Sequence, residues 1–472
     1  MSKKLIQNTS IYAVGNILPQ AANFILLPLF TKFLSPEDFG IISALSVLTS
    51  VLAIFFTLAI DRSIFRLYFD YTTEKDKKNF LGTVSIALYA ISTLVLIIIF
   101  LLNKLVGKIY SSIEFYPFYT YAILAAYFEL FGIIPKAYFR VVEKAKVFVL
   151  ISFIQFIVKN VILILIVVVL KQGASGYLKG MMYSSLVLVP IFLVIQARII
   201  NFRFVLDMFK SSIFFSLPVL PNLLSAWVLN LSDRIFLEKY FTLKDLGIYS
   251  LSYKIASLVL VFSAAFYSAY SPHFFKVANT NEISIAKKAL FKTNTIYVLL
   301  ILIFSFGIIL FSKEIIILLF ESEYYSAYKL IPIIVLAYII SQSAGPLNLS
   351  IYQNKKTVVV MVNMIIVGVI NILLNFLLIP IYGAFGAAYA TLITYISLFV
   401  IQYHAARRYF FIPYNFKILL PLLILFIAFH SFFVFLDIEN MYLSIIIKLI
   451  VILIICWITY IKYKKEIVVL FT

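Results

Sequence analysis

The sequence has little charge and almost no cysteine. Only 12% of its 472 residues are charged and 64% are hydrophobic, whereas about 25% of residues are charged in a soluble domain. The single cysteine, Cys456, excludes an internal disulfide framework and any cysteine cluster for a metal. The three histidines are scattered, at His273, His404 and His430. The composition predicts an all-α polytopic membrane protein, and we expect neither a metal site nor a cofactor.

Catalytic motifs are also missing. The chain has no HExxH, no P-loop, no GxSxG and no glycine-rich dinucleotide turn. We therefore expect a membrane transporter and not an enzyme, driven by an ion gradient, the membrane potential or removal of the product. A membrane polymerase or ligase would carry catalytic residues on a large outer loop. The longest loop expected outside, 313–327, is too short for that role.

About fourteen segments are long and apolar enough to cross a bilayer, which takes roughly 20 residues. The first, at 10–31, lacks a small-residue cleavage site, and we interpret it as a retained helix and not as a signal peptide. The predicted spans are 10–31, 39–60, 81–102, 115–135, 147–170, 180–197, 212–233, 246–270, 293–312, 328–352, 357–379, 385–404, 418–436 and 441–461.

The basic residues that give the net charge of +19 lie mainly in the loops between these spans. About two thirds of the 39 lysines and arginines fall in alternate loops, so the charge reports topology and does not indicate a nucleic-acid partner. Because basic loops remain in the cytoplasm, we expect both termini to be cytoplasmic. The polar segment 271–292 is expected to be a helical linker on that side.

A short sequence motif occurs twice, each time at the start of a predicted span. Ser35-Pro36-Glu37-Asp38 has the pattern of a helix-capping box, and Thr242-Leu243-Lys244-Asp245 repeats it. Each copy is followed by a matching Gly-Ile-x-Ser, starting at Gly40 and Gly247. The repeat predicts two six-helix lobes in parallel, related by a pseudo-twofold axis along the membrane normal, plus two further helices. The predicted domains are 1–205, 206–410 and 411–472.

The first span of each lobe is polar along one face. Asn16, Gln20 and Asn23 share a face in the first lobe, and Asn222 heads the corresponding face in the second. Such residues either join helices by hydrogen bonds or line a hydrated cavity. Their presence in both lobes favours the cavity.

Ionisable residues inside spans are costly and mark candidate sites. Glu129 and Lys159 are expected at similar depth in neighbouring spans, as a buried ion pair or as a proton or anion site. Lys254, on the second helix of its lobe, is expected in the cavity, while Lys448 is expected to extend toward the interface.

Arginines at span ends add further candidates. Arg62 and Arg66 are spaced i, i+4 at a cytoplasmic span end, where they either anchor the topology or bind phosphate. Asp233 and Arg234, near an outer mouth, form either a gate pair or an interfacial salt bridge.

Four stretches between residues 30 and 396 carry a family resemblance. They are FTKFLSPEDFGIIS, LSDRIFLEKYFTLKDLGIYSLSYKIA, ESEYYSAYKLIPIIVLAYII and NILLNFLLIPIYGAFGAAYATLITYI. Together they resemble the oligosaccharide flippase (Wzx-type polysaccharide transporter) branch of the multidrug/oligosaccharidyl-lipid/polysaccharide exporter superfamily.

The resemblance implies alternating access by two lobes around a cationic cavity. The implied cargo is an undecaprenyl-pyrophosphate-linked oligosaccharide that moves from the cytoplasmic to the outer leaflet for O-antigen, capsule or exopolysaccharide synthesis. The implied pyrophosphate-binding residues are Arg62, Arg66, Arg234 and Lys254, and the two C-terminal helices are implied to hold the lipid tail. Membrane lipid, a polysaccharide polymerase and chain-length machinery are the further partners implied.

The alternative is a cation-coupled multidrug exporter of the same superfamily. Such an exporter is expected to keep acidic residues inside its lobes to bind organic cations. Glu129 is the only acid well inside a predicted span, which favours the flippase.

Overall fold

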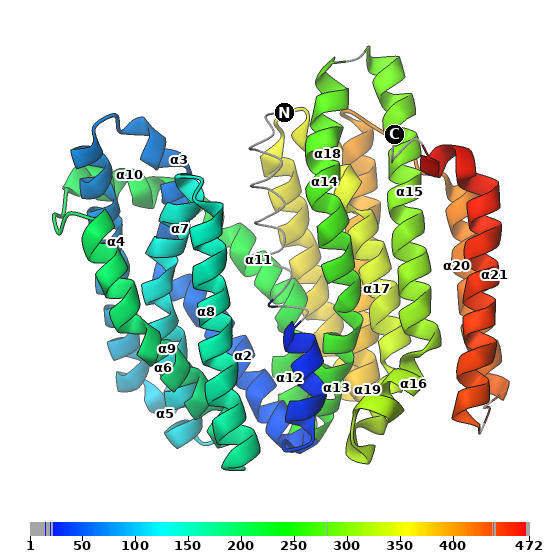
Figure 1. Cartoon of the computed structure of the whole chain (residues 1–472), viewed down its shortest axis with the longest axis horizontal. Coiled ribbons are helices and arrows are strands. Elements are labelled where there is room, and N and C mark those ends of the chain that lie inside the picture. Colours follow the sequence, from blue (N-terminus) through cyan, green and yellow to red (C-terminus); the bar gives the residue numbers. More distant parts are fainter. Residues whose placement is uncertain are drawn as a thin grey trace. The chain divides into compact units, whose positions relative to one another are not determined.

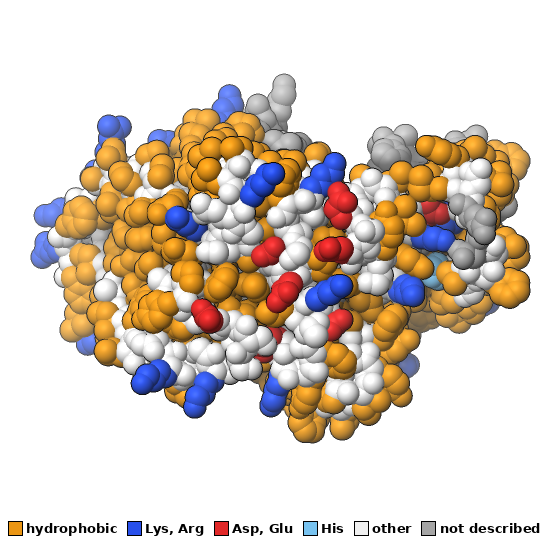
Figure 2. All heavy atoms as spheres, turned by 90° about the horizontal axis from the view of Figure 1, so that it is seen from below, with side chains coloured by type: hydrophobic (Ala, Val, Ile, Leu, Met, Phe, Trp, Pro, Cys, Tyr) orange, Lys and Arg blue, Asp and Glu red, His pale blue; other side chains and the backbone are white. Residues whose placement is uncertain are grey.

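The computed structural model describes residues 15, 19, 22–280, 282–436, 438 and 440–468. Within these residues the secondary structure is helical, and the chain separates into two compact units, 1–247 and 248–472. Eleven of the described helices are long and apolar enough to cross a membrane. On the face drawn in Figure 2, hydrophobic side chains cover much of the visible surface. The predicted all-α polytopic class is confirmed.

The first unit holds the helices up to the start of α13 (Figure 1). Its main elements are a helix at Ala22–Thr31, α2 (Pro36–Thr57), η1 (Ile60–Ser63), α3 (Ile64–Leu67), η2 (Tyr68–Asp70), α4 (Glu74–Leu101), α5 (Asn103–Val106), η3 (Phe115–Tyr119), α6 (Thr120–Glu129), η4 (Leu130–Gly132), α7 (Ile133–Val141), α8 (Ala145–Leu163), η5 (Ile164–Val169), α9 (Gly173–Ile199), α10 (Leu206–Ser216), η6 (Leu217–Val219), α11 (Leu220–Leu231), α12 (Asp233–Tyr240) and α13 (Leu243–Ala256).

The second unit continues α13 and contains the rest of the chain. Its elements are α14 (Leu258–Thr280), α15 (Ile283–Leu310), α16 (Ser312–Leu319), η7 (Ser322–Lys329), α17 (Ile331–Ser343), α18 (Gly345–Tyr352), α19 (Thr357–Arg407), α20 (Phe416–Leu436) and α21 (Met441–Val468). The segment 271–292 is not a separate linker helix, because α14 runs to Thr280 and α15 begins at Ile283. The three-domain boundaries expected from the sequence stay a prediction.

Helix α19 contains two of the predicted spans. Gly383 breaks it with φ 57° and ψ −133°, a conformation that only glycine adopts easily. The contacts Asn363–Gln402 and Asn371–Thr394 are nested about this glycine, as in an antiparallel hairpin. The spans 357–379 and 385–404 are therefore two helical arms joined at Gly383.

The predicted capping boxes are both present. Ser35 Oγ accepts the Asp38 backbone N–H at 3.1 Å, and Asp38 Oδ2 accepts the Ser35 N–H at 3.0 Å. The second copy repeats the pattern, since Thr242 Oγ1 accepts the Asp245 N–H at 3.2 Å and Asp245 Oδ2 accepts the Thr242 N–H. The repeated sequence thus encodes the same local structure in both places.

The glycines that follow the two boxes make reciprocal contacts. A Cβ on Gly40 would lie 1.9 Å from the Leu243 carbonyl oxygen, and a Cβ on Gly247 would lie 1.8 Å from the Pro36 carbonyl oxygen. Leu243 and Pro36 occupy the same place in the two copies, so the contact is symmetric under exchange of the copies. This is the pattern that a twofold repeat produces, and it explains why both positions are glycine.

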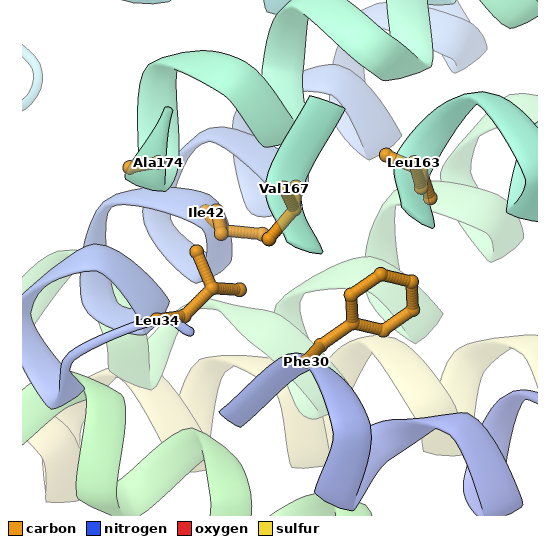
Figure 3. Close-up of a cluster of buried hydrophobic side chains, with 6 residues drawn as sticks. All are labelled: Phe30, Leu34, Ile42, Leu163, Val167 and Ala174. Atoms are coloured by element: carbon orange, nitrogen blue, oxygen red, sulfur yellow. The ribbon is translucent and has the colours of Figure 1, made fainter. Parts of the chain in front are cut away.

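Asp38 also joins α2 to α9. Its second carboxylate oxygen, Oδ1, accepts the Ala174 N–H at 2.9 Å, at the first turn of α9. Ala174 also belongs to a buried cluster with Phe30, Leu34, Ile42, Leu163 and Val167, drawn in Figure 3. One carboxylate thus caps two helices that share an apolar core.

We expect Asp38→Ala to lower the free energy of unfolding by about 2 kcal/mol, because losing one cap costs roughly 1 kcal/mol and two caps depend on this residue. The check is thermal denaturation of the purified protein in detergent. Glu37→Ala is the matched control, since Glu37 is in the same helical turn and is exposed. Equal melting temperatures for the two variants would contradict the double cap.

Candidate functional site

The first unit contains a cavity of about 410 Å³ between α2, the α6–η4–α7 segment and α9. Its lining residues are Leu45, Ser46, Thr49, Ser50, Ala53, Ala122, Ala125, Ala126, Glu129, Leu130, Ile133, Lys136, Leu178 and Met181. The volume falls in the range of small-ligand sites, roughly 300–1,000 Å³. All of these residues belong to one unit, so the cavity is a feature of that unit alone.

One wall of the cavity consists of a small and polar face of α2. Ser46, Thr49, Ser50 and Ala53 are spaced i, i+3, i+4, i+7 and therefore share a helix face. The three hydroxyls donate to backbone carbonyls within α2, at 2.6 to 3.1 Å. Their remaining lone pairs can accept hydrogen bonds from a ligand. Alanines on α6 complete the lining and leave space that larger side chains would fill.

The opposite wall carries both charges of the cavity. Glu129 ends α6, η4 follows as one turn of 3-10 helix, and Lys136 lies on α7, so the two residues are separated by two turns. Glu129 lies within electrostatic reach of Lys136, and the described residues form no salt bridge at either group. Both charged groups therefore retain capacity for a ligand: the ammonium for an oxyanion, the carboxylate for hydroxyl or cationic groups.

Trp227 of α11 makes hydrogen bonds to the α2 wall of the cavity. Its indole N–H lies 3.0 Å from Ser50 Oγ and 3.2 Å from the Val47 carbonyl oxygen. The indole therefore holds Ser50 in place, and it belongs to the predicted seventh span, 212–233.

The pair predicted between Glu129 and Lys159 does not form. Lys159 lies on α8, does not line the cavity and makes no ion pair within the described part of the chain. Similar depth in two neighbouring helices does not decide which way each side chain faces, and the η4 turn redirects the chain after Glu129. The cation near Glu129 is Lys136, at the end of the predicted fourth span.

Arg62 and Arg66 are exposed and each has a carboxylate nearby. Arg62 Nε lies 3.6 Å from Asp61, and Arg66 pairs with Asp70. Burial raises the pKa of Asp61 above its ordinary value, while Arg62 opposes the shift. The predicted common face is interrupted, because α2 ends at Thr57 and Arg62 and Arg66 fall on η1 and α3.

Asp233 and Arg234 form a buried pair. Arg234 Nη1 lies 3.0 Å from Asp233 Oδ1 and also donates to the Asn230 carbonyl at 2.9 Å. Each side chain is less than a tenth exposed. This pair fits the salt-bridge alternative at least as well as the gate.

The remaining candidates lie on exposed helix faces or outside the described residues. Asn23, Asn222 and Lys254 are exposed, on the helix Ala22–Thr31, on α11 and on α13. Asn16 and Gln20 lie outside the described residues. Asn23, Asn222 and Lys254 do not line the cavity of the first unit.

Sequence analysis placed Lys136 on a cationic face at the end of the fourth span and not beside Glu129, and it missed the hydroxyl face of α2 and Trp227. A usable signal existed for the first two. Ser46, Thr49, Ser50 and Ala53 form a small and polar stripe in an otherwise apolar span, and Glu129 and Lys136 share a face at i, i+7. Nothing in the sequence links Trp227 to Ser50.

Comparison with known proteins gives matches over most of the chain. The family described as "Polysaccharide biosynthesis protein" matches residues 5–278, and the MatE family matches residues 218–377. An uncharacterized membrane protein of Haemophilus influenzae is 23% identical over 58% of this chain and 65% of its own length. The probable low-salt glycan biosynthesis flippase Agl15 of Haloferax volcanii is 25% identical over 39% of each chain.

Solved structures share the fold. The lipid II flippase MurJ in an inward closed conformation has a TM-score of 0.76 at 16% identity, covering 97% of this chain and 99% of that one. An outward-facing multidrug resistance MATE family transporter has a TM-score of 0.55 at 13% identity, covering 86% and 95%. This chain spans about two thirds of the length of the first relative.

Proposed function

Because the chain belongs to the polysaccharide biosynthesis protein family, we propose that it is a flippase for a lipid-linked oligosaccharide, with undecaprenyl pyrophosphate as the lipid carrier. The proposed direction is from the cytoplasmic to the outer leaflet of the bacterial inner membrane, with both termini in the cytoplasm. The product would feed surface polysaccharide synthesis, together with a polymerase and chain-length machinery.

The cavity of the first unit is the observation that supports this proposal. A pyrophosphate and a sugar need cationic and hydroxyl partners away from lipid, and the cavity offers Lys136, Glu129 and the hydroxyls of Ser46, Thr49 and Ser50. At about 410 Å³ it accommodates a headgroup portion and not a whole lipid-linked glycan. The lipid tail would remain in the bilayer while the polar part occupies the cavity.

Each cavity group has a separate proposed role. Lys136 would hold a phosphate oxyanion, since an ammonium donates three hydrogen bonds to oxygen. Glu129 would accept from sugar hydroxyls, and the α2 hydroxyls would add acceptors on the facing wall. Lys254, Asn23 and Asn222, which are exposed, would contact the cargo outside this cavity, as would Arg62 and Arg66. Arg234 and Asp233 would act in gating.

We expect Lys136→Met to reduce glycan export roughly 10- to 100-fold, because a hydrogen bond to a charged group contributes about 1.5–3 kcal/mol. The measurement is surface glycan in cells lacking the protein and complemented with each variant. Lys159→Met is the matched control, since it removes the same charge from a span without altering the cavity lining. Equal export by the two variants, at equal expression, would contradict the assigned cavity.

The MatE match over residues 218–377 favours a second candidate, a cation-coupled multidrug exporter. Glu129 would then bind the coupling ion or an organic cation. This candidate predicts that deletion sensitises cells to cationic dyes and leaves surface glycan unchanged. Loss of glycan with unchanged dye sensitivity would eliminate it.

A further inference from the structure

Arg140 lies in the last turn of α7. The basic loops predict that this end of the helix faces the cytoplasm. Its guanidinium carbon is 5.4 Å from the centroid of the Phe65 ring on α3 and 5.4 Å from the centroid of the Phe148 ring on α8. Both distances are within the range of cation–π contacts, about 6 Å. Two separate elements therefore hold one exposed arginine.

Arg140 differs from Arg62 and Arg66 in having no ion pair among the described residues. The packed elements η1, α3 and α7 carry three other cations: Arg62 beside Asp61, Arg66 paired with Asp70, and Lys136 near Glu129. Over the described residues, the Arg140 side chain makes ring contacts only, with no ion pair or hydrogen bond. No carboxylate in the described part of the chain therefore occupies its guanidinium donors.

Cation–π contacts leave the hydrogen-bonding capacity of a guanidinium unused. The rings interact with the charge through their π faces, whereas the five N–H donors remain for an acceptor. A planar fork of donors matches a phosphate bidentately. Contacts that fix the long side chain beforehand also reduce the entropy lost on binding.

Exposed aromatic side chains lie on the elements beside Arg140. Phe65 is 37% exposed and Phe69, on η2, is 64% exposed. Arg140 ends a membrane span, Phe115–Val141, where phosphate headgroups meet water. A ligand that combines a phosphate with an apolar chain satisfies both features.

We propose that Arg140 binds the phosphate of a membrane amphiphile, as an oxyanion site separate from the cavity that contains Lys136. The shared chemistry is a phosphate ester on a lipid. It has two sources, a bilayer phospholipid and a polyprenyl pyrophosphate. The first source is independent of the cargo, whereas the second rests on the proposed function.

The test is native mass spectrometry of the full chain in detergent with two separate probes, phosphatidylglycerol and undecaprenyl pyrophosphate. We expect Arg140→Gln to weaken retention of at least one probe about 10-fold or more, the loss that follows from a charge-assisted hydrogen bond. Arg198→Gln is the matched control, because Arg198 is exposed in the last turn of α9 and no ring contact or ion pair involves it among the described side chains.

Two further variants separate binding from folding. Arg140→Lys keeps the charge but not the planar fork, so we expect an intermediate loss, whereas Arg198→Lys leaves retention unchanged. Phe65→Leu keeps the arginine and should weaken retention about 2- to 5-fold, the equivalent of 0.5–1 kcal/mol.

A loss confined to phosphatidylglycerol assigns the site to the bilayer, and a loss confined to undecaprenyl pyrophosphate assigns it to the carrier lipid; both support the proposal. Equal retention of both probes by Arg140→Gln and Arg198→Gln overturns it. This readout is binding, so it is distinct from the export defect expected for Lys136→Met.

Discussion

Gly247→Ala is expected to lower the free energy of unfolding by at least about 3 kcal/mol, the upper part of the usual range for overpacking. The new methyl group would lie 1.8 Å from the Pro36 carbonyl oxygen. A backbone atom cannot rotate away as a side chain does, so the first turns of α2 and α13 must separate. Gly40→Ala meets the equivalent Leu243 carbonyl at 1.9 Å and should have the same effect.

Gly307→Ala is the control for both glycine variants. It lies on α15, and the nearest atom to its new methyl group is 3.9 Å away. Because alanine favours helix over glycine by about 1 kcal/mol, this variant should be neutral or slightly stabilising. The measurement is thermal denaturation in detergent. If Gly247→Ala and Gly307→Ala have equal melting temperatures, the first turns of α2 and α13 are not in close contact.

Breaking the buried ion pair between Glu314 and Lys448 is expected to cost about 3–5 kcal/mol, because the surviving charge stays buried without its partner. Lys448 Nζ lies 2.5 Å from Glu314 Oε1, and Ser444 Oγ donates to the same oxygen at 2.6 Å. Both charged residues are less than a tenth exposed, and the Phe433 ring lies 5.6 Å from the ammonium. The expectation that Lys448 extends toward the interface was wrong.

This pair connects α16 to α21, and Phe433 adds α20, so three helices of the second unit meet at one ammonium. Glu314→Gln and Lys448→Met should each lower the melting temperature in detergent strongly. The double variant should recover part of the loss, since it leaves neither charge buried alone. A double variant as unstable as the summed single variants would show that the two residues act independently.

The helices could be predicted from the sequence, because a helix that crosses a bilayer needs about 20 consecutive and mostly apolar residues. Capping boxes are equally local, and both were predicted correctly at Ser35 and Thr242. The repeat aligned Gly40 with Gly247, but the close approach of each glycine to the backbone of the other copy was not predicted.

Contacts between distant side chains could not be predicted in this way. Glu314 and Lys448 are 134 residues apart, and no periodicity relates them. Depth was a poor guide for Glu129, since it placed Lys159 beside it while the turn of η4 brings Lys136 there. The end of α2 was also hidden, because Leu58 and Ala59 adopt positive φ values of 44° and 56° that are uncommon for such residues.

The most direct measurement of the proposed function is the leaflet distribution of polyprenyl-pyrophosphate glycans in membranes of cells lacking this protein, with and without a complementing copy. The flippase proposal predicts that one defined glycan accumulates on the cytoplasmic leaflet and that the wild-type copy clears it. An undisturbed distribution of every lipid-linked glycan would contradict the proposal and leave the cavity of Glu129 and Lys136 to another cargo.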